Sequence, residues 1–115
     1  MKVISIKENH IFRRLYAKGK SAVSPCLAFY CRRNGRSCSR LGITVSAKLG
    51  KAVRRNKIRR RIREIYRIHQ GELLPGWDIV VVARVKAAHS SYAAMERSFL
   101  SAVDKLGLRR KETQT

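Results

Sequence analysis

A run of cations between Lys51 and Arg67 carries the clearest chemical signal in this sequence. It reads Lys-Ala-Val-Arg-Arg-Asn-Lys-Ile-Arg-Arg-Arg-Ile-Arg-Glu-Ile-Tyr-Arg, in which nine of seventeen residues are lysine or arginine and only Glu64 is acidic. Arginine presents a planar fork that can bind phosphate oxygens with two hydrogen bonds, and it stays charged at every relevant pH. The run therefore predicts a surface that binds a polyanion, with Glu64 as a local ion-pair partner of a neighbouring arginine.

The spacing of these residues is that of a two-faced helix, which we expect over residues 52–70 with Gly71 as its stop. At about 100° per residue, the apolar side chains share one narrow face that must lie against a sheet. That face holds Ile58, Ile62, Ile65 and His69, the opposite face holds Asn56, Arg59, Arg60, Arg63 and Arg67, and Arg55 and Tyr66 lie at the boundary. Like charges four residues apart repel, so this is not an ordinary solvated face.

The charge of the whole chain points the same way. Its 115 residues include 27 Lys+Arg and 7 Asp+Glu, which gives a formal net charge of +20. Such a body repels itself unless a polyanion binds, and nucleic acid is the first candidate, with an anionic membrane second. With 44% hydrophobic residues the chain can also bury a small core, which argues against a disordered basic tail.

Several function classes are disfavoured. No stretch approaches the ~20 apolar residues needed to cross a bilayer, and the first residues lack a signal-peptide pattern. Cys26, Cys31 and Cys38 are odd in number and lack zinc-ligand spacing, so we expect free thiols in a cytoplasmic protein without a metal site of its own. Catalytic residues are not expected either, because the seven acids are scattered singly and the three histidines form no spaced set.

The remaining elements predict one RNA-binding domain over residues 1–115, with a flexible basic and polar tail from about 109 to 115. Helical spacing and strand alternation place the elements as follows: a helix at 8–18, strands near 26–33 and 39–46, a buried central strand at 77–85, and a helix from Ser90 or Ser91 to Gly107. With the basic helix, the order is αββαβα. This is an α+β, two-layer sandwich in which helices pack on one mixed sheet.

Residues 50–64 closely resemble the Arg-Asn-rich signature of the bacterial ribonuclease P protein family. In that family an Arg-Asn pair is followed three residues on by a basic pair and then by another arginine. Arg55-Asn56, Arg59-Arg60 and Arg63 fit this pattern, although Arg59 stands where lysine is more usual. The resemblance extends over most of the chain, including 11–12, 40–46 and 78–84.

This resemblance implies a left-handed crossover through the basic helix, as in the ribosomal protein S5 domain 2-like fold, although parallel crossovers are ordinarily right-handed. It also implies a protein subunit of ribonuclease P, which removes the 5′ leader from precursor tRNA. The RNA subunit performs the hydrolysis with Mg²⁺. The expected partners are therefore ribonuclease P RNA and precursor tRNA, with neither a membrane nor an obligate protein partner.

The resemblance assigns two sets of binding residues. The catalytic RNA would contact Lys51, Arg54, Arg55, Asn56, Arg59, Arg60, Arg63 and Arg67. The single-stranded leader would lie in a cleft between the first helix and the sheet, against Phe12, Tyr16, Tyr30, Thr44 and Lys48. Aromatic rings beside positive charge suit an unpaired strand, because bases stack on rings with little sequence preference. The alternative for Phe12, Tyr16 and Tyr30 is ordinary packing in the core.

Three rival functions are compatible with a basic chain of this size. A ribosomal or other structural RNA-binding protein shares the charge and related folds, although many such proteins carry long basic tails rather than one internal basic helix. A DNA-binding regulator would need its basic helix in a helix-turn-helix pair, whereas this one lies between strands. A free-standing protein nuclease would need clustered carboxylates.

Overall fold

Four strands form one mixed sheet in the computed structural model, which describes residues 3–110. In their spatial order, the strands are β1 (Lys20–Val23), β2 (Leu27–Arg33), β4 (Trp77–Ala83) and β3 (Arg40–Thr44). The β1–β2 and β2–β4 pairs are antiparallel and the β3–β4 pair is parallel. The Val-rich strand is therefore internal, as its apolar run predicts. β1 has no counterpart among the predicted strands, so the order is αβββαβα rather than αββαβα.

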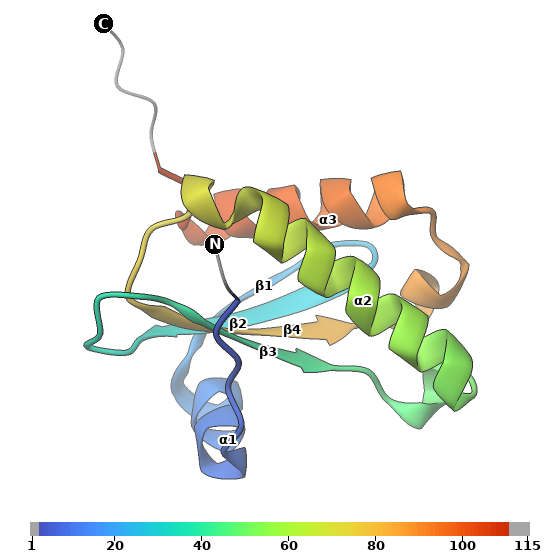
Figure 1. Cartoon of the computed structure of the whole chain (residues 1–115), viewed down its shortest axis with the longest axis horizontal. Coiled ribbons are helices and arrows are strands. Elements are labelled where there is room, and N and C mark those ends of the chain that lie inside the picture. The colour runs from blue at the N-terminus through green and yellow to red at the C-terminus, as the bar shows by residue number, and fades with distance from the viewer. Residues whose placement is uncertain (1–2, 111–115) are drawn as a thin grey trace, which may run out of the picture.

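Helices cover both faces of this sheet (Figure 1). α2 (Ala52–His69) and α3 (Tyr92–Leu106) lie side by side on one face, and α1 (Asn9–Lys18) lies on the other. Ser91 begins α3, where its hydroxyl accepts a hydrogen bond from the amide of Ala94, and Gly107 ends it in a left-handed conformation. The α+β class is thus confirmed. The predicted first helix, α1, lies on the other face of the sheet and so forms a layer beyond the two that were predicted.

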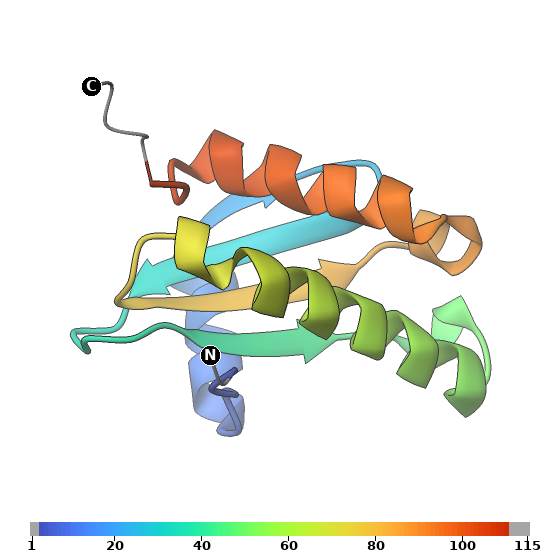
Figure 2. The ribbon, with the colours of Figure 1, turned by 45° about the horizontal axis from the view of Figure 1, so that its top comes forward.

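The crossover from β3 through α2 to β4 is left-handed, as Figure 2 shows. Both arrows point right in that view, β4 lies above β3, and α2 lies between the sheet and the viewer. A right-handed crossover with the helix on this side would place β4 below β3. The hand implied by the family resemblance is therefore correct, and the general rule would have given the wrong topology.

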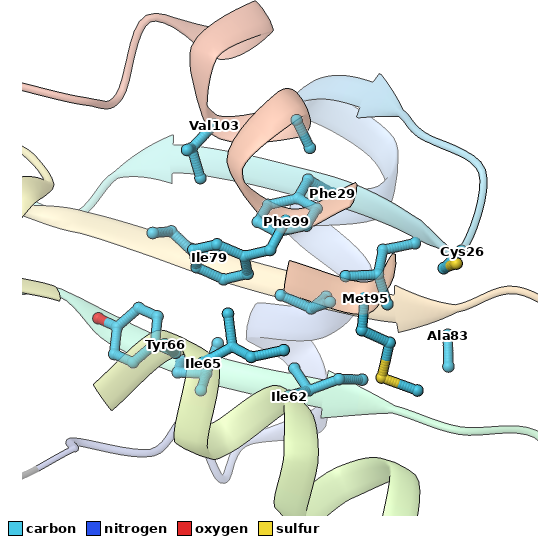
Figure 3. Close-up of a cluster of buried hydrophobic side chains, with 14 of the residues drawn as sticks. Cys26, Phe29, Ile62, Ile65, Tyr66, Ile79, Ala83, Met95, Phe99 and Val103 are labelled. Atoms are coloured by element: carbon cyan, nitrogen blue, oxygen red, sulfur yellow. The ribbon is translucent and has the colours of Figure 1, made fainter. Parts of the chain in front are cut away.

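The main core fills the space between the sheet and the α2–α3 layer (Figure 3). Ile58, Ile62 and Ile65 are buried as predicted, and the ring of Phe99 packs edge-on against Phe29 at 5.1 Å. Tyr66, expected at the boundary of the two helix faces, is buried instead, with its ring 6.5 Å from that of Phe99. The neighbouring helix α3 widens the covered side of α2, and burial raises the pKa of Tyr66 to about 12.

Two further expectations concern the cysteines and the carboxyl end. Cys26 and Cys31 are buried, Cys38 is exposed, and all three are free thiols.

The end of the described chain is held against the segment before β4. Arg109 and Arg110 were predicted to lie in a flexible tail. Instead, Arg109 forms a β-bridge with Leu73, and the Arg110 amide donates to the Glu72 carbonyl at 2.6 Å. The rest of that predicted tail, 111–115, lies outside the described residues. Among the described helices, none is long and apolar enough to cross a membrane.

Candidate nucleic-acid interface

The outward side of α2 presents the predicted basic face. Asn56, Arg60, Arg63 and Arg67 are exposed there, whereas Arg55 and Arg59 are half-buried. Two hydrogen bonds hold part of this face in place: Arg59 donates to the side-chain oxygen of Asn56, and Arg63 donates to the hydroxyl of Ser5, each at 3.2 Å. A rigid helix therefore carries closely spaced guanidinium groups toward solvent, an arrangement suited to successive phosphates.

One arginine of this face is neutralised within the protein. Arg67 donates from its Nε and Nη2 atoms to the two carboxylate oxygens of Glu64. The Arg67 hydrogen bonds lower the pKa of Glu64, and Glu64 raises the pKa of Arg67 in return. Glu64 is thus the local ion-pair partner that the sequence predicts. The free positive charge of the face is concentrated at Arg59, Arg60 and Arg63.

The start of α2 adds two more of the predicted RNA-binding residues. Lys51 is the N-cap and Arg54 lies in the first turn, and both are exposed. They line a shallow hollow of about 540 Å³ together with Val53 and Lys57. Gly50, which directly precedes Lys51, has a φ of 127°, a conformation that favours glycine. This turn fixes where α2 begins and therefore where Lys51 and Arg54 lie.

The predicted leader-binding residues meet on the opposite face of the sheet. The Tyr16 hydroxyl lies 2.8 Å from Oγ1 of Thr44, and the Tyr16 ring packs edge-on against Tyr30 with centroids 5.0 Å apart. The Phe12 ring lies 6.5 Å from that of Tyr16. Since Tyr16 is still 41% exposed, it offers aromatic surface to a ligand rather than completing a core. Residues from α1, β2 and β3 are thus brought together as expected.

Phe12 has a packing role in this cleft. A methyl group added at Gly42 would lie only 2.6 Å from Cζ of Phe12, so the glycine makes room for the ring. Phe12 also packs on the small core that Leu15 and Val80 form under α1. Lys48 is exposed in the 3₁₀ turn Ala47–Leu49, just beyond Thr44. Much of the Phe12 side chain therefore packs against the protein itself, whereas Tyr16 and Lys48 are exposed to solvent.

Comparisons with known proteins identify this combination of a basic helix and an aromatic cleft. Residues 1–107 match the family model described as Ribonuclease P. The ribonuclease P protein component of Desulfosudis oleivorans is 42% identical over 97 residues, which cover 80% of each chain. That of Alkaliphilus oremlandii is 37% identical over 109 residues, 94% of this chain and 96% of the relative. The chain belongs to the ribonuclease P protein family.

Solved structures of the ribonuclease P protein family have the same fold. The RNase P protein of Staphylococcus aureus aligns with a TM-score of 0.86 at 36% identity, covering 95% of this chain and 100% of that one. The protein from Thermotoga maritima aligns with a TM-score of 0.80 at 34% identity, covering 95% and 98%. The chain is therefore a protein subunit of ribonuclease P, a ribonucleoprotein endoribonuclease of tRNA 5′ processing, and the ribosomal alternative is set aside.

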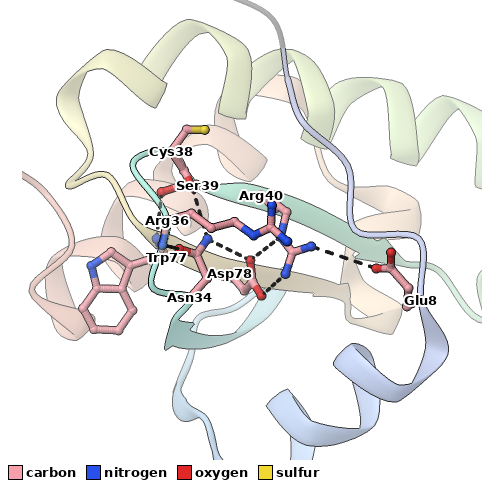
Figure 4. Close-up of polar contacts among 8 residues, drawn as sticks. All are labelled: Glu8, Asn34, Arg36, Cys38, Ser39, Arg40, Trp77 and Asp78. Carbon is pink, nitrogen blue, oxygen red and sulfur yellow. Dashed lines mark hydrogen bonds and ion pairs between the residues drawn. The ribbon is translucent and has the colours of Figure 1, made fainter.

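Two polar clusters in this ribonuclease P subunit were not predicted. Asp78 is buried at the start of β4, where Arg40 donates to both of its oxygens at 2.8 and 2.7 Å (Figure 4). His69 lies between Glu72 and Glu96, at 2.7 and 2.8 Å from their carboxylates, and stacks on Phe99. Arg40 with Asp78 and His69 with Glu96 are pairs that only the fold brings together, whereas Glu72 lies three residues from His69. An acid opening an apolar strand was a usable signal for Asp78.

Proposed function

We propose that the subunit binds ribonuclease P RNA through the basic face of α2 and holds the precursor tRNA leader in the cleft between α1 and the sheet. The observation that carries this proposal is the convergence of Tyr16, Tyr30 and Thr44 from three elements into one partly exposed cleft. An unpaired strand can stack on such rings, at about 1–3 kcal/mol per base. The basic face supplies guanidinium groups for backbone phosphates.

The two surfaces lie on opposite faces of the sheet and meet at the end of β3. Thr44 is the last residue of β3 and lies in the cleft, Lys48 follows in the 3₁₀ turn, and Lys51 is the N-cap of α2. A short segment thus leads from the leader cleft to the RNA-binding helix. This continuity supports an arrangement in which the leader leaves the catalytic RNA beside α2 and enters the cleft past Lys48.

The subunit's chemical contribution is positioning. Mg²⁺ would act with the RNA subunit, as the family resemblance implies. The protein would then raise affinity for the substrate and for the metal ions of the RNA. We further propose that it works in the cytoplasm with RNA alone, without an obligate protein partner.

A reconstitution tests this function. The purified protein is added to ribonuclease P RNA and precursor tRNA at low Mg²⁺, and leader removal is followed over time. We expect faster cleavage than with the RNA alone and a lower Mg²⁺ requirement. An unchanged rate at every Mg²⁺ concentration would contradict the proposal. A Tyr16→Ala variant that stimulates as well as the wild type would contradict the cleft assignment alone.

A further inference from the structure

A second concentration of positive charge lies beside α1, and the proposed function does not use it. It is a pocket of about 230 Å³ between α1, the end of β2, the following loop and the start of β3. Five arginines line it: Arg14, Arg32, Arg33, Arg36 and Arg40. We call this site the arginine pocket.

The arginine pocket and the aromatic cleft lie on opposite flanks of α1. Leu15 faces the sheet and is buried, so Tyr16 and Arg14 project about 100° to either side of it. Along the strands, Arg32 lies two residues beyond Tyr30, level with Arg40 and Asp78 and at the far end of β3 from Thr44. Helix α1 therefore separates the two sites, and the pocket is not an extension of the leader cleft.

The positive charge of this pocket is mostly uncompensated. Asp78 is the acid in its lining, and both of its oxygens are already occupied by Arg40, with Asn34 donating a further hydrogen bond at 3.0 Å (Figure 4). Within residues 3–110, no acid forms an ion pair with Arg14, Arg32 or Arg36. Like charges gathered in a concave site raise the free energy of the unbound protein, and a bound anion lowers it.

The floor of the pocket is held in place before any ligand arrives. Asn34 joins the loop after β2 to Asp78, and its side-chain oxygen accepts the backbone amide of Arg36 at 2.8 Å. Side chains positioned in this way lose less conformational entropy on binding. The guanidinium of Arg33 lies instead over the ring of Trp77, 5.8 Å from the ring centroid and on the α2–α3 side of the sheet, so the guanidinium groups available to a ligand in the pocket are those of its other arginines.

We propose that the arginine pocket is a phosphate-binding site, occupied in the ribonucleoprotein by backbone phosphates of RNA. Several guanidinium forks around one small pocket match the tetrahedral oxygens of a phosphate, which accepts paired hydrogen bonds. The site would give the subunit a second RNA-binding surface, on the sheet face opposite α2. It stands apart from the leader cleft, so it does not depend on that assignment.

The first test uses inorganic phosphate and the free protein. The amide NMR signals of Asn34 and Arg36, which lie in the pocket lining, are followed during titration with sodium phosphate at constant ionic strength. We expect a saturable change, and the affinity for phosphate should fall at least about tenfold in Arg32→Gln/Arg36→Gln, because this variant removes two guanidinium groups that can donate paired hydrogen bonds to phosphate oxygens. The control is Arg13→Gln/Arg97→Gln, which removes two exposed arginines outside the pocket.

The second test measures affinity for ribonuclease P RNA, with and without bound precursor tRNA, against salt concentration. Each phosphate that the pocket variant no longer binds should make the slope of log K against log salt shallower by about 0.7–0.9 relative to the control variant. If phosphate binds in the pocket but this slope matches the control, the occupant is free phosphate rather than RNA, and the proposed RNA-binding role is wrong. If the pocket variant matches the control in both tests, or the wild type gives no saturable signal with phosphate, the whole proposal is wrong.

Discussion

The hydroxyl of Tyr16 lies 2.8 Å from Oγ1 of Thr44, a hydrogen bond between residues 28 positions apart in the chain. It ties α1 to the end of β3 and holds the Tyr16 ring edge-on against Tyr30. The hydrogen bond to Thr44 and the edge contact with Tyr30 together orient the exposed ring of Tyr16, which is the proposed stacking surface.

Two substitutions at Tyr16 distinguish the contribution of its ring to leader binding from that of its hydroxyl. Tyr16→Ala should weaken binding of precursor tRNA by about 1–3 kcal/mol, the value of one base–aromatic stack, and should leave mature tRNA binding unchanged. Tyr16→Phe keeps the ring and removes the bond to Thr44, so we expect a smaller loss of about 0.5–1.5 kcal/mol. Fluorescence anisotropy of labelled tRNAs with the reconstituted enzyme measures both. Equal losses for the precursor and mature tRNA would contradict the leader assignment.

The elements whose evidence is local were predictable from the sequence. The isoleucine spacing of α2 gives its buried side, and the alternation around Tyr30 and Thr44 places both on the α1 side of the sheet. Glu64 could be paired because its arginine partner lies three residues away on the same helix. Each of these features follows from helix or strand periodicity.

Features that depend on distant partners were not predictable. β1 has only four residues without a clear apolar pattern, and it is a strand because β2 offers it a hydrogen-bonding edge. Tyr66 is buried because α3 packs beside α2. Arg40 and Asp78 are 38 positions apart and meet only through the parallel pairing of β3 with β4. The crossover hand was available only from the family resemblance.

Removing charge from α2 should change how RNA binding depends on salt. The triple variant Arg59→Gln/Arg60→Gln/Arg63→Gln should make the slope of log K against log salt shallower by about 0.7–0.9 for each phosphate that is no longer bound. Arg13→Gln/Arg97→Gln is a control that removes exposed arginines away from this face. Filter-binding with ribonuclease P RNA over a range of salt concentrations measures the slope. A triple variant with the wild-type slope would mean that this face does not touch the RNA backbone.

Gly42→Ala should destabilise the protein through Phe12. The added methyl group would lie 2.6 Å from Cζ of the ring, so either the ring or α1 must move. We expect a loss of about 1–3 kcal/mol in the free energy of unfolding, as for other overpacked sites. Urea denaturation followed by Trp77 fluorescence gives the value. In a Phe12→Leu background the same substitution should cost less, and an equal cost would show that the strain arises elsewhere.

His69 should make the stability of the subunit depend on pH. Burial lowers the pKa of this histidine, but the hydrogen bonds with Glu96 and Glu72 and their negative charge outweigh burial, so the net shift is upward. The aromatic ring that stacks on this histidine, Phe99, carries no charge. The His69 ring therefore binds its proton more tightly in the folded protein than in the unfolded chain.

The sign of the pH effect follows from linkage. A raised pKa gives stability that is fully present below the unfolded value of about 6.5 and is lost as pH rises through the folded pKa. His69→Gln should thus lower the unfolding midpoint by more at pH 6 than at pH 9, with Glu96→Gln giving the same trend. Urea midpoints from pH 6 to 9 measure this gap, and His89→Gln, at an exposed position, is the control. A gap that stays constant with pH would mean that His69 stabilises the protein by packing on Phe99 and not by its charge.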